Sequence, residues 1–249
     1  MLRKKTLTIV EPLPSTIEDE AFSSFDKIFK LSGKPVSQNP QSLTFYLDIK
    51  NHRFYVKRYH TTKGIRSWLG MSRIRQEARN QLWFNRMGVP SARVVAFGEE
   101  HILSRTIRGF LITEYVKNTE DLAWTVKNRP LLFNNQKWVT QVINQIAEIT
   151  RTIHQHNFCH NDLYWRNILV SQDIDLPQVY LIDCPLGQRF FGPFLRYRII
   201  KDLACLDKVG KQILSRTRRL RFYKEYRQCH KLSKEDRKIV LKSLEYFKG

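Results

Sequence analysis

The sequence predicts an α+β fold, with a small lobe built on an antiparallel β-sheet and one helix, followed by a larger, mainly helical lobe. Segments rich in β-branched and aromatic residues, which favour strands, lie between residues 42 and 116. One helical pattern interrupts them, and from residue 134 onward apolar residues recur mostly at helical spacing. This order of elements predicts two lobes, residues 1–114 and residues 115–249.

The predicted sheet starts with a hairpin. Residues 42–50 (SLTFYLDIK) and 53–60 (RFYVKRYH) have strand composition, and the polar pair at 51–52 joins them. Residues 93–100 and 109–116 return to the same composition around a polar connection. The first lobe is therefore expected to hold a sheet made from these segments.

A helix is predicted over about residues 72–88, between the hairpin and the later strands. Ile74, Ala78 and Leu82 follow helical spacing. The sequence Gly-Val-Pro at 88–90 is a helix stop. We expect this helix to belong to the first lobe.

The second lobe is expected to contain a long core helix and a short strand pair. Residues 167–170 and 179–183 are typical of strands and are joined through a turn at Pro177. Residues 196–242 contain 16 Lys or Arg against 5 Asp or Glu, interleaved with apolar residues, which predicts amphipathic helices with a basic outer face. The core helix, over about residues 134–157, carries one apolar stripe: Trp138, Val142, Ile146, Ile149 and Ile153.

The formal charge of +20, from 43 Lys and Arg against 23 Asp and Glu, predicts a polyanionic partner. Nucleic acid, an anionic membrane face and a phosphorylated substrate all satisfy this condition. The arginines at 216–221 are a candidate anion contact.

No segment approaches the roughly 18 apolar residues of a membrane span, and Glu11 and Pro12 interrupt the apolar run near the N-terminus before it reaches signal-peptide length. Membrane contact is therefore expected to be peripheral.

The four cysteines indicate neither a zinc ribbon nor a short disulfide framework. They lie at positions 159, 184, 205 and 229, without a CxxC pair. A reducing cytoplasm fits this spacing best. Cys159 and Cys184 flank the candidate site described next and are expected to be small core residues.

The stretch HNDLYWRN, residues 160–167, contains candidates for chemistry. Asp162 and Asn167 lie five apart on a predicted loop between a helix and a strand, and Asp183 ends the next strand. Phosphoryl transfer needs a carboxylate to orient the attacking hydroxyl and hard oxygen ligands for Mg²⁺. Asp162 is therefore predicted to be the catalytic base, with Asn167 and Asp183 as metal ligands. His160 is expected to be structural, with its ring packing and hydrogen-bonding to fix the loop.

The same chemistry uses a lysine on the nucleotide phosphates, held by a helix glutamate. Lys57 lies in the middle of a predicted strand, and Glu77 is the only acid between residues 50 and 98. We predict that Glu77 pairs with Lys57, which then contacts the phosphates.

Five motifs together resemble protein-kinase-like enzymes. HNDLYWRN is similar to their catalytic loop, YVKRYH to their strand lysine and QEARNQLWFNRMGVPS to their helix glutamate. LITEYV resembles their hinge, and YLIDC resembles the segment with their metal-binding aspartate. More narrowly, VKRYH, GIRSWLG, EARN with MGVPS, and KDLACL with RTRRLRFYKEY resemble bacterial lipopolysaccharide kinases, a group of core heptose kinases, Kdo kinases and InaA-like proteins.

The resemblance implies a protein-kinase-like two-lobe fold and an enzyme that uses ATP and Mg²⁺ to phosphorylate a heptose or Kdo hydroxyl of the lipopolysaccharide inner core. It implies that Glu114, Tyr115 and Val116 form the hinge whose backbone contacts adenine. It also implies a cytoplasmic enzyme, peripheral at the inner membrane of a Gram-negative cell. The expected partners are the lipopolysaccharide core glycolipid and the anionic membrane surface, and no nucleic acid is expected.

Three features depart from the kinase pattern. No GxGxxG occurs, and Gly33 is the only glycine before residue 64. Asp183 is followed by Cys-Pro rather than Phe-Gly, so regulation by activation-loop switching is not expected. Tyr164 stands where many protein kinases have a lysine, so Arg166 or another cation is expected to neutralise the transferring phosphoryl group.

Alternative functions stay open. A kinase of another small hydroxyl substrate, similar to aminoglycoside phosphotransferases, would share the Asp-to-Asn spacing, although those sites are usually acidic and this chain is basic. A basic RNA-binding protein on a kinase-like scaffold would account for the charge, although the sequence contains no RNA-recognition motif. A pseudokinase is disfavoured because Lys57, Asp162, Asn167 and Asp183 are all present.

Overall fold

The computed structural model describes residues 3–10, 21–60, 72–103 and 105–248. The chain forms two compact units, Met1–Trp83 with Ala92–Val116, and Phe84–Ser91 with Lys117–Gly249. The motif GIRSWLG lies outside the described residues.

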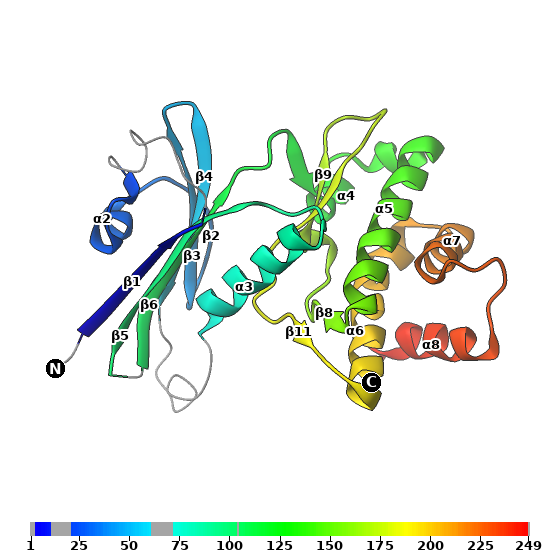
Figure 1. Cartoon of the computed structure of the whole chain (residues 1–249). Coiled ribbons are helices and arrows are strands. Elements are labelled where there is room, and N and C mark those ends of the chain that lie inside the picture. The colour runs from blue at the N-terminus through cyan, green and yellow to red at the C-terminus, as the bar shows by residue number, and fades with distance from the viewer. Residues whose placement is uncertain (1–2, 11–20, 61–71, 104, 249) are drawn as a thin grey trace. The chain divides into compact units, whose positions relative to one another are not determined.

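The first unit is built on a six-stranded antiparallel sheet with the order β1-β5-β6-β4-β3-β2 (Figure 1). The predicted hairpin, the later strands and the helix α3 are confirmed. A further helix, α2, places Phe25 and Ile28 in the core. The elements are β1 (Arg3–Ile9), α2 (Phe25–Lys30), β2 (Lys34–Asn39), β3 (Ser42–Ile49), β4 (His52–His60), α3 (Arg73–Arg86), β5 (Val94–Ile102) and β6 (Arg105–Glu114).

The turn of the predicted hairpin lies one residue earlier than the sequence suggested. Lys50 and Asn51 have φ values of 47° and 67°. Two successive left-handed residues form the type I′ turn that matches the twist of paired strands. His52, which the sequence placed in the turn, therefore already belongs to β4.

Side-chain alternation along β4 separates the core from the candidate phosphate lysine. Phe54 and Val56 are buried, and the Phe54 ring meets Phe22 edge to face at 5.3 Å between centroids. Because successive side chains of a strand point to opposite faces, Lys57 projects from the other face, where its side chain is 18% exposed.

The strands β1 and β2 and the helix α2 were not predicted from the sequence. β1 and β2 are the two edges of the sheet, and most of their described side chains are at least partly exposed. Edge strands are held largely by backbone pairing, so they lack the apolar alternation that identifies buried strands. α2 has six residues, too few for a helical period to be visible.

The second unit contains the predicted core helix, α5 (Gln136–Gln155), whose apolar stripe is buried as expected. α7 packs on α5, and α8 packs on α6. The basic tail is helical as predicted, and its first helix starts before the predicted segment. These helices are α6 (Gly192–Ile213), α7 (Arg216–Arg227) and α8 (Lys234–Glu245), preceded in the unit by α4 (Leu122–Asn128) and the 3₁₀ turn η3 (Pro130–Asn134).

The predicted short strand pair is confirmed as β9 (Ile168–Ser171) and β10 (Val179–Leu181). A third strand, β7 (Thr119–Asp121), pairs with β9 and was missed because its three residues, Thr-Glu-Asp, are all polar. β8 (Phe158–Cys159) pairs with β11 (Gln188–Arg189). The β8–β11 pair brings the HNDLYWRN loop, which follows β8, next to the segment that precedes β11.

Arg218 and Arg219 of α7 have partners within the second unit, and an anion contact of the arginines at 216–221 stays a prediction. Arg218 donates to the Phe133 carbonyl and to Gln136 Oε1, both at 2.7 Å. Arg219 forms a two-bond ion pair with Asp207 at 2.6 and 2.7 Å. These two side chains therefore stabilise helix packing, and their number alone does not indicate anion binding.

Candidate active site

Asp162 lies between β8 and the 3₁₀ turn η4 (Trp165–Asn167), and two neighbours hold its carboxylate. Asn167 Nδ2 donates to Asp162 Oδ2 at 3.0 Å and to the Asp162 carbonyl at 2.8 Å. The Arg166 guanidinium donates to both carboxylate oxygens at 2.9 and 3.0 Å. The Asp162 side chain stays 24% exposed. A fixed carboxylate that solvent can reach is suited to accept a hydroxyl proton.

The spacing of five between Asp162 and Asn167 is produced by a tight turn. The Tyr164 N–H donates to the Asp162 carbonyl, and the Asn167 N–H donates to the Tyr164 carbonyl, both at 2.8 Å. Asn167 is buried. Its Nδ2 is used on Asp162, and among the described residues nothing donates to its Oδ1. That oxygen is the atom with which Asn167 can bind a cation.

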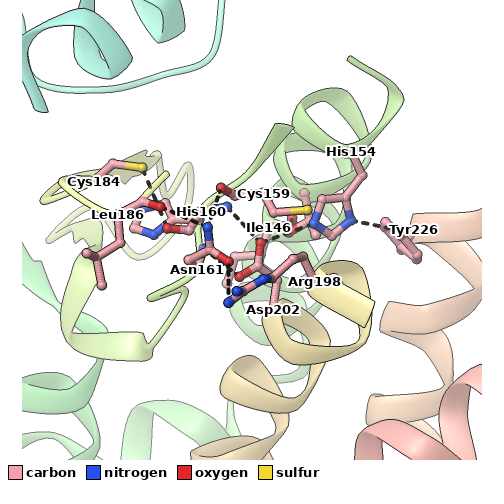
Figure 2. Close-up of polar contacts among 11 residues, drawn as sticks. Ile146, His154, Cys159, His160, Asn161, Cys184, Leu186, Arg198, Asp202 and Tyr226 are labelled. Atoms are coloured by element: carbon pink, nitrogen blue, oxygen red, sulfur yellow. Dashed lines mark hydrogen bonds and ion pairs between the residues drawn. The ribbon is translucent and has the colours of Figure 1, made fainter. Parts of the chain in front are cut away.

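Asp202 of α6 anchors the two residues before Asp162 (Figure 2). Its carboxylate accepts the His160 N–H and the Asn161 N–H, both at 2.8 Å, and Asp202 is completely buried. Asn161 has a left-handed φ of 64°, and its Nδ2 donates to the Leu186 carbonyl at 2.8 Å. The backbone leading to Asp162 is therefore fixed from both α6 and the segment before β11.

His154 of α5 extends this network to α7 (Figure 2). Its Nε2 lies 3.3 Å from Asp202 Oδ2, and its Nδ1 lies 2.9 Å from the Tyr226 hydroxyl. An imidazole with its proton on Nε2 satisfies both contacts, since Nδ1 then accepts from the hydroxyl. Burial raises the pKa of Tyr226, which keeps the hydroxyl a donor. Three helices are thus connected to the candidate catalytic loop.

His154, Cys159 and Asp202 also offer ligand atoms within 4.8 Å of one another, a spacing compatible with a metal ion. However, His154 and Asp202 already hydrogen-bond through both ring nitrogens and both carboxylate oxygens. Burial, followed by the charge of Asp202, raises the pKa of Cys159, whereas a metal ligand has to be a thiolate. The cluster is a structural network and not a metal centre.

His160 is fully buried, as expected for a structural residue, but neither ring nitrogen has a hydrogen-bond partner among the described residues, so the expected ring hydrogen bonding is wrong. Its ring stacks on Phe84 with centroids 6.3 Å apart and an interplanar angle of 15°. Burial lowers the pKa of His160, although the carboxylates of Asp202, Asp162 and Asp183 act in the opposite direction. A buried imidazole with a lowered pKa is poorly suited to act as an acid at neutral pH.

Asp183 lies next to the catalytic loop in the second unit. It has a left-handed φ of 56°, a conformation that Asp tolerates better than most residues. The N–H of the preceding residue, Ile182, donates to the Asn167 carbonyl at 3.0 Å. The structure therefore places Asp183 and Asn167 on adjoining segments, and their role as metal ligands stays a prediction.

In the first unit, Lys57 and Glu77 form an ion pair. Lys57 Nζ lies 3.1 and 3.2 Å from the two carboxylate oxygens of Glu77. Glu77 is 4% exposed, and the Tyr59 hydroxyl donates to its Oε2. Burial, followed by the charge of Glu77, raises the pKa of Tyr59, so this hydroxyl remains protonated. The buried acid is satisfied by two donors, and it fixes the ammonium group of Lys57.

Two of the three expected hinge residues already use their backbone N–H groups in hydrogen bonds within the first unit. The Glu114 N–H donates to the Arg93 carbonyl at 2.9 Å, and the Tyr115 N–H donates to the Arg53 carbonyl at 3.0 Å. These two N–H groups are therefore unavailable to adenine in this conformation. Adenine would have to be read by carbonyl groups or by Val116.

Gly33, the only glycine before residue 64, is required for packing. A Cβ atom at this position would lie 2.1 Å from the Tyr46 carbonyl oxygen. The residue therefore allows the chain entering β2 to approach β3. It does not supply a glycine-rich phosphate loop, in agreement with the missing GxGxxG.

Sequence reasoning missed Asp202, His154 and Tyr226. Asp202 carried a detectable signal, since it is a lone acid on the apolar side of a helix, next to Leu203 and Leu206. Buried acids need partners. The sequence did not indicate which partners, because His160 lies 42 residues from Asp202.

A solved structure with a similar arrangement of helices and strands identifies the fold. The structure is similar to that of WaaP in complex with acyl carrier protein, with a TM-score of 0.74 and 21% sequence identity. The match covers 98% of this chain and 96% of that chain. The protein therefore has a protein-kinase-like α+β fold, as the sequence predicted.

Sequence comparison identifies the family. Two curated 3-deoxy-D-manno-octulosonic acid kinases, from Mannheimia succiniciproducens and Actinobacillus succinogenes, are each 29% identical over 96 residues. These matches cover 39% of this chain and 37% of each relative, so the chain spans little more than a third of the relatives' length. The model of the lipopolysaccharide kinase (Kdo/WaaP) family matches residues 42–226. The chain belongs to this family, which confirms the resemblance seen in its motifs.

Proposed function

We propose that the protein is a kinase that transfers a phosphoryl group from ATP to a hydroxyl of heptose or Kdo in the lipopolysaccharide inner core. The main support for this proposal is the geometry of Asp162, whose carboxylate is held by Asn167 and Arg166 on a loop anchored by Asp202. A member of the Kdo/WaaP family with this arrangement has the groups that proton acceptance from a sugar hydroxyl requires.

Residues of the second unit perform the proposed chemistry. Asp162 accepts the proton of the attacking hydroxyl. Asn167 Oδ1 and the Asp183 carboxylate are hard oxygen donors, so they fit Mg²⁺ better than a softer metal. When bound, Mg²⁺ would neutralise charge on the nucleotide phosphates. Arg166 is 58% exposed and pairs with Asp162, so a side-chain rotation could move its charge to the transferring phosphoryl group.

Residues of the first unit bind the nucleotide in this proposal. Lys57 contacts the phosphates, and its two contacts with the Glu77 carboxylate orient its ammonium group. The backbone of Glu114, Tyr115 and Val116 contacts adenine, through carbonyl groups in the case of the first two residues. ATP is thus the proposed phosphoryl donor.

The acceptor and the membrane are proposed from chemistry. Lipopolysaccharide core is an anionic glycolipid, and the chain carries a net charge of +20. Lys and Arg near an anionic membrane gain about 1 kcal/mol each. Among the described residues, no helix has the length and apolar character needed to span a bilayer. We propose peripheral binding at the cytoplasmic face of the inner membrane.

Lys57→Met is expected to raise the KM for ATP at least tenfold and to lower kcat about a hundredfold, because the phosphates lose their positioned cation. Transfer of labelled phosphate from ATP with Mg²⁺ to dephosphorylated core lipopolysaccharide measures both values. Lys30→Met, which replaces an exposed lysine of α2, is the matched control.

If the wild-type protein transfers no phosphate to heptose-containing or Kdo-containing acceptors, the proposed function is wrong. Transfer to an aminoglycoside instead would favour the alternative small-substrate kinase. Strongly salt-dependent RNA binding without ATP turnover would favour the RNA-binding alternative.

We also propose that an acyl carrier protein is a partner, since the related WaaP has been solved with one. The second unit contains a cavity of about 590 Å³, within the range of small-molecule sites. A buried methylene contributes about 0.8 kcal/mol, so an acyl chain would bind well in apolar surroundings. The cavity lining combines apolar side chains with the basic residues Lys211, Arg216 and Lys248.

Acylated carrier protein is expected to raise the melting temperature of the wild-type protein, and more so for longer acyl chains. Gly210→Leu should abolish this rise, because Gly210 lines the cavity and a leucine side chain would fill part of it. Gly210→Ala is the matched control and should retain the rise, because a Cβ atom there lies an ordinary 3.7 Å from Trp165. A rise that does not depend on the acyl chain would contradict the cavity as its binding site.

A further inference from the structure

Four aromatic side chains form a series of ring contacts that begins beside Asp162, and the proposal above gives them no role. Tyr164 lies two residues after Asp162, and its ring is 6.4 Å from that of Phe247. Phe247 is 5.0 Å from Tyr246, which is 5.8 Å from Tyr197 of α6. We call these four rings the aromatic platform. It connects the candidate catalytic loop, α6 and the residues after α8.

The aromatic platform is partly open to solvent and is held in place by polar contacts. Phe247 is 42% exposed and Tyr197 is 52% exposed. The hydroxyls of Tyr197 and Tyr246 are 2.9 Å apart. The turn that contains Tyr164 is closed by its N–H bond to the Asp162 carbonyl. Exposed aromatic groups that are fixed before binding indicate a recognition surface, since little conformational entropy is lost on binding.

Lys208 of α6 adds a cation to the aromatic platform. Its Nζ lies 5.0 Å from the Phe247 ring centroid and 5.6 Å from that of Tyr164. Lys208 is exposed, and no carboxylate of the described residues lies within ion-pair distance of it. The neighbouring Asp207 is bound by Arg219. The charge of Lys208 is therefore available to an anionic ligand.

These features fit a sugar that carries a negative charge. A sugar ring presents C–H groups to one side, and such groups are attracted to the negative face of an aromatic ring. A lysine binds a carboxylate or a phosphate as a point charge. Tyr197 and Lys208 are eleven positions apart on α6, or about 16 Å, which is longer than one sugar ring. The surface can therefore contact more than one residue of a glycan.

We propose that the aromatic platform and Lys208 bind the acceptor through an anionic sugar and present its hydroxyl to Asp162. This inference rests on the proposed function, and it adds the residues that select the acceptor. Tyr164 connects the two sites, because it belongs to the same turn as Asp162 and its ring contacts both Arg166 and Lys208. The negative group on the sugar is a carboxylate or a phosphate.

Binding can be measured without turnover in full-length protein carrying Asp162→Asn. The ligands are a deacylated inner-core oligosaccharide with its Kdo carboxylates, the same oligosaccharide with those carboxylates reduced to alcohols, and the reduced form carrying a heptose phosphate. Lys208→Ala should weaken binding of a charged ligand about ten- to a hundredfold and leave binding of the uncharged ligand unchanged. Phe247→Ala should weaken all three.

The controls are Lys238→Ala, an exposed lysine of α8, and Phe194→Ala, an exposed aromatic residue of α6 that is not part of the platform. Both should bind like the parent protein. If the first ligand binds more strongly than the third, the negative group is a carboxylate. If the third binds more strongly than the first, it is a phosphate. If none of the three ligands binds, or if Lys208→Ala binds the charged ligands as the parent does, the proposed subsite is wrong.

Kinetics with the active protein separate this inference from the proposed function. Lys208→Ala should raise the KM for the acceptor about ten- to a hundredfold, with the KM for ATP and the melting temperature unchanged. If wild-type protein phosphorylates the acceptor and Lys208→Ala changes neither KM nor binding, the subsite fails and the kinase function stands. If no sugar is phosphorylated but binding still depends on Lys208, the kinase function fails and the subsite stands.

Discussion

Asparagine in place of Asp162 is expected to lower kcat for phosphate transfer by about a thousandfold, because a carboxamide cannot take the proton of the attacking hydroxyl. The substitution preserves the size of the side chain. The KM for ATP should stay within about twofold, since the phosphate contact assigned to Lys57 and the metal ligand assigned to Asp183 are unchanged. Single-turnover phosphate transfer under saturating ATP measures the chemical step directly.

The matched control is Asp175→Asn, an acid on the connection between β9 and β10 whose side chain is 89% exposed. It should retain wild-type turnover. A kcat for Asp162→Asn within tenfold of wild type would remove Asp162 from the role of base. Loss of ATP binding together with kcat would instead indicate that Asp162 organises the nucleotide site.

Asp202→Ala is expected to have the largest effect on stability, lowering the free energy of unfolding by about 3–5 kcal/mol. The substitution leaves the N–H groups of His160 and Asn161 and the Nε2 of His154 without their buried acceptor. Because the first two residues directly precede Asp162, kcat should also fall about a hundredfold at temperatures where the variant is folded. Urea unfolding and phosphate transfer measure the two effects separately.

Two control variants divide the Asp202 network into parts. Asp207→Ala removes an acid from the same helix, but its partner Arg219 is partly exposed, so it should cost about 1 kcal/mol or less. Tyr226→Phe removes the hydroxyl bound to His154 and leaves both contacts of Asp202 with the loop, so kcat should stay near wild type. Equal kcat losses in Asp202→Ala and Tyr226→Phe would contradict direct anchoring of the loop by Asp202.

Much of the fold could be predicted because its signals are local. The apolar stripe of α5 and the alternation of β3 and β4 are properties of consecutive residues, and both are present in the structure. The elements that were missed are short or lie at sheet edges, as in β1, β2 and β7, where backbone pairing replaces side-chain burial. The arginines of α7 were predicted to contact an anion because of their density, and their order in the chain did not indicate the partners that Arg218 and Arg219 have in the folded unit.

Part of the candidate site could also be predicted from the sequence. Asp162 and Asn167 share one turn. The ion pair of Lys57 with Glu77 could be predicted because phosphoryl transfer uses a lysine that is held by a glutamate. Lys208 could not be distinguished among 43 basic residues, because its position over Tyr164 and Phe247 depends on how α6 meets the end of the chain.

The sequence alone determined the family resemblance, the strand and helix that carry Lys57 and Glu77, and the loop that carries Asp162 and Asn167, since each depends on residues a few positions apart. Tertiary structure alone decided the surroundings of that loop. The contact of His154 with Tyr226 joins residues 72 positions apart. Such contacts arise from helix packing, which brings together side chains whose order along the chain gives no sign that they meet.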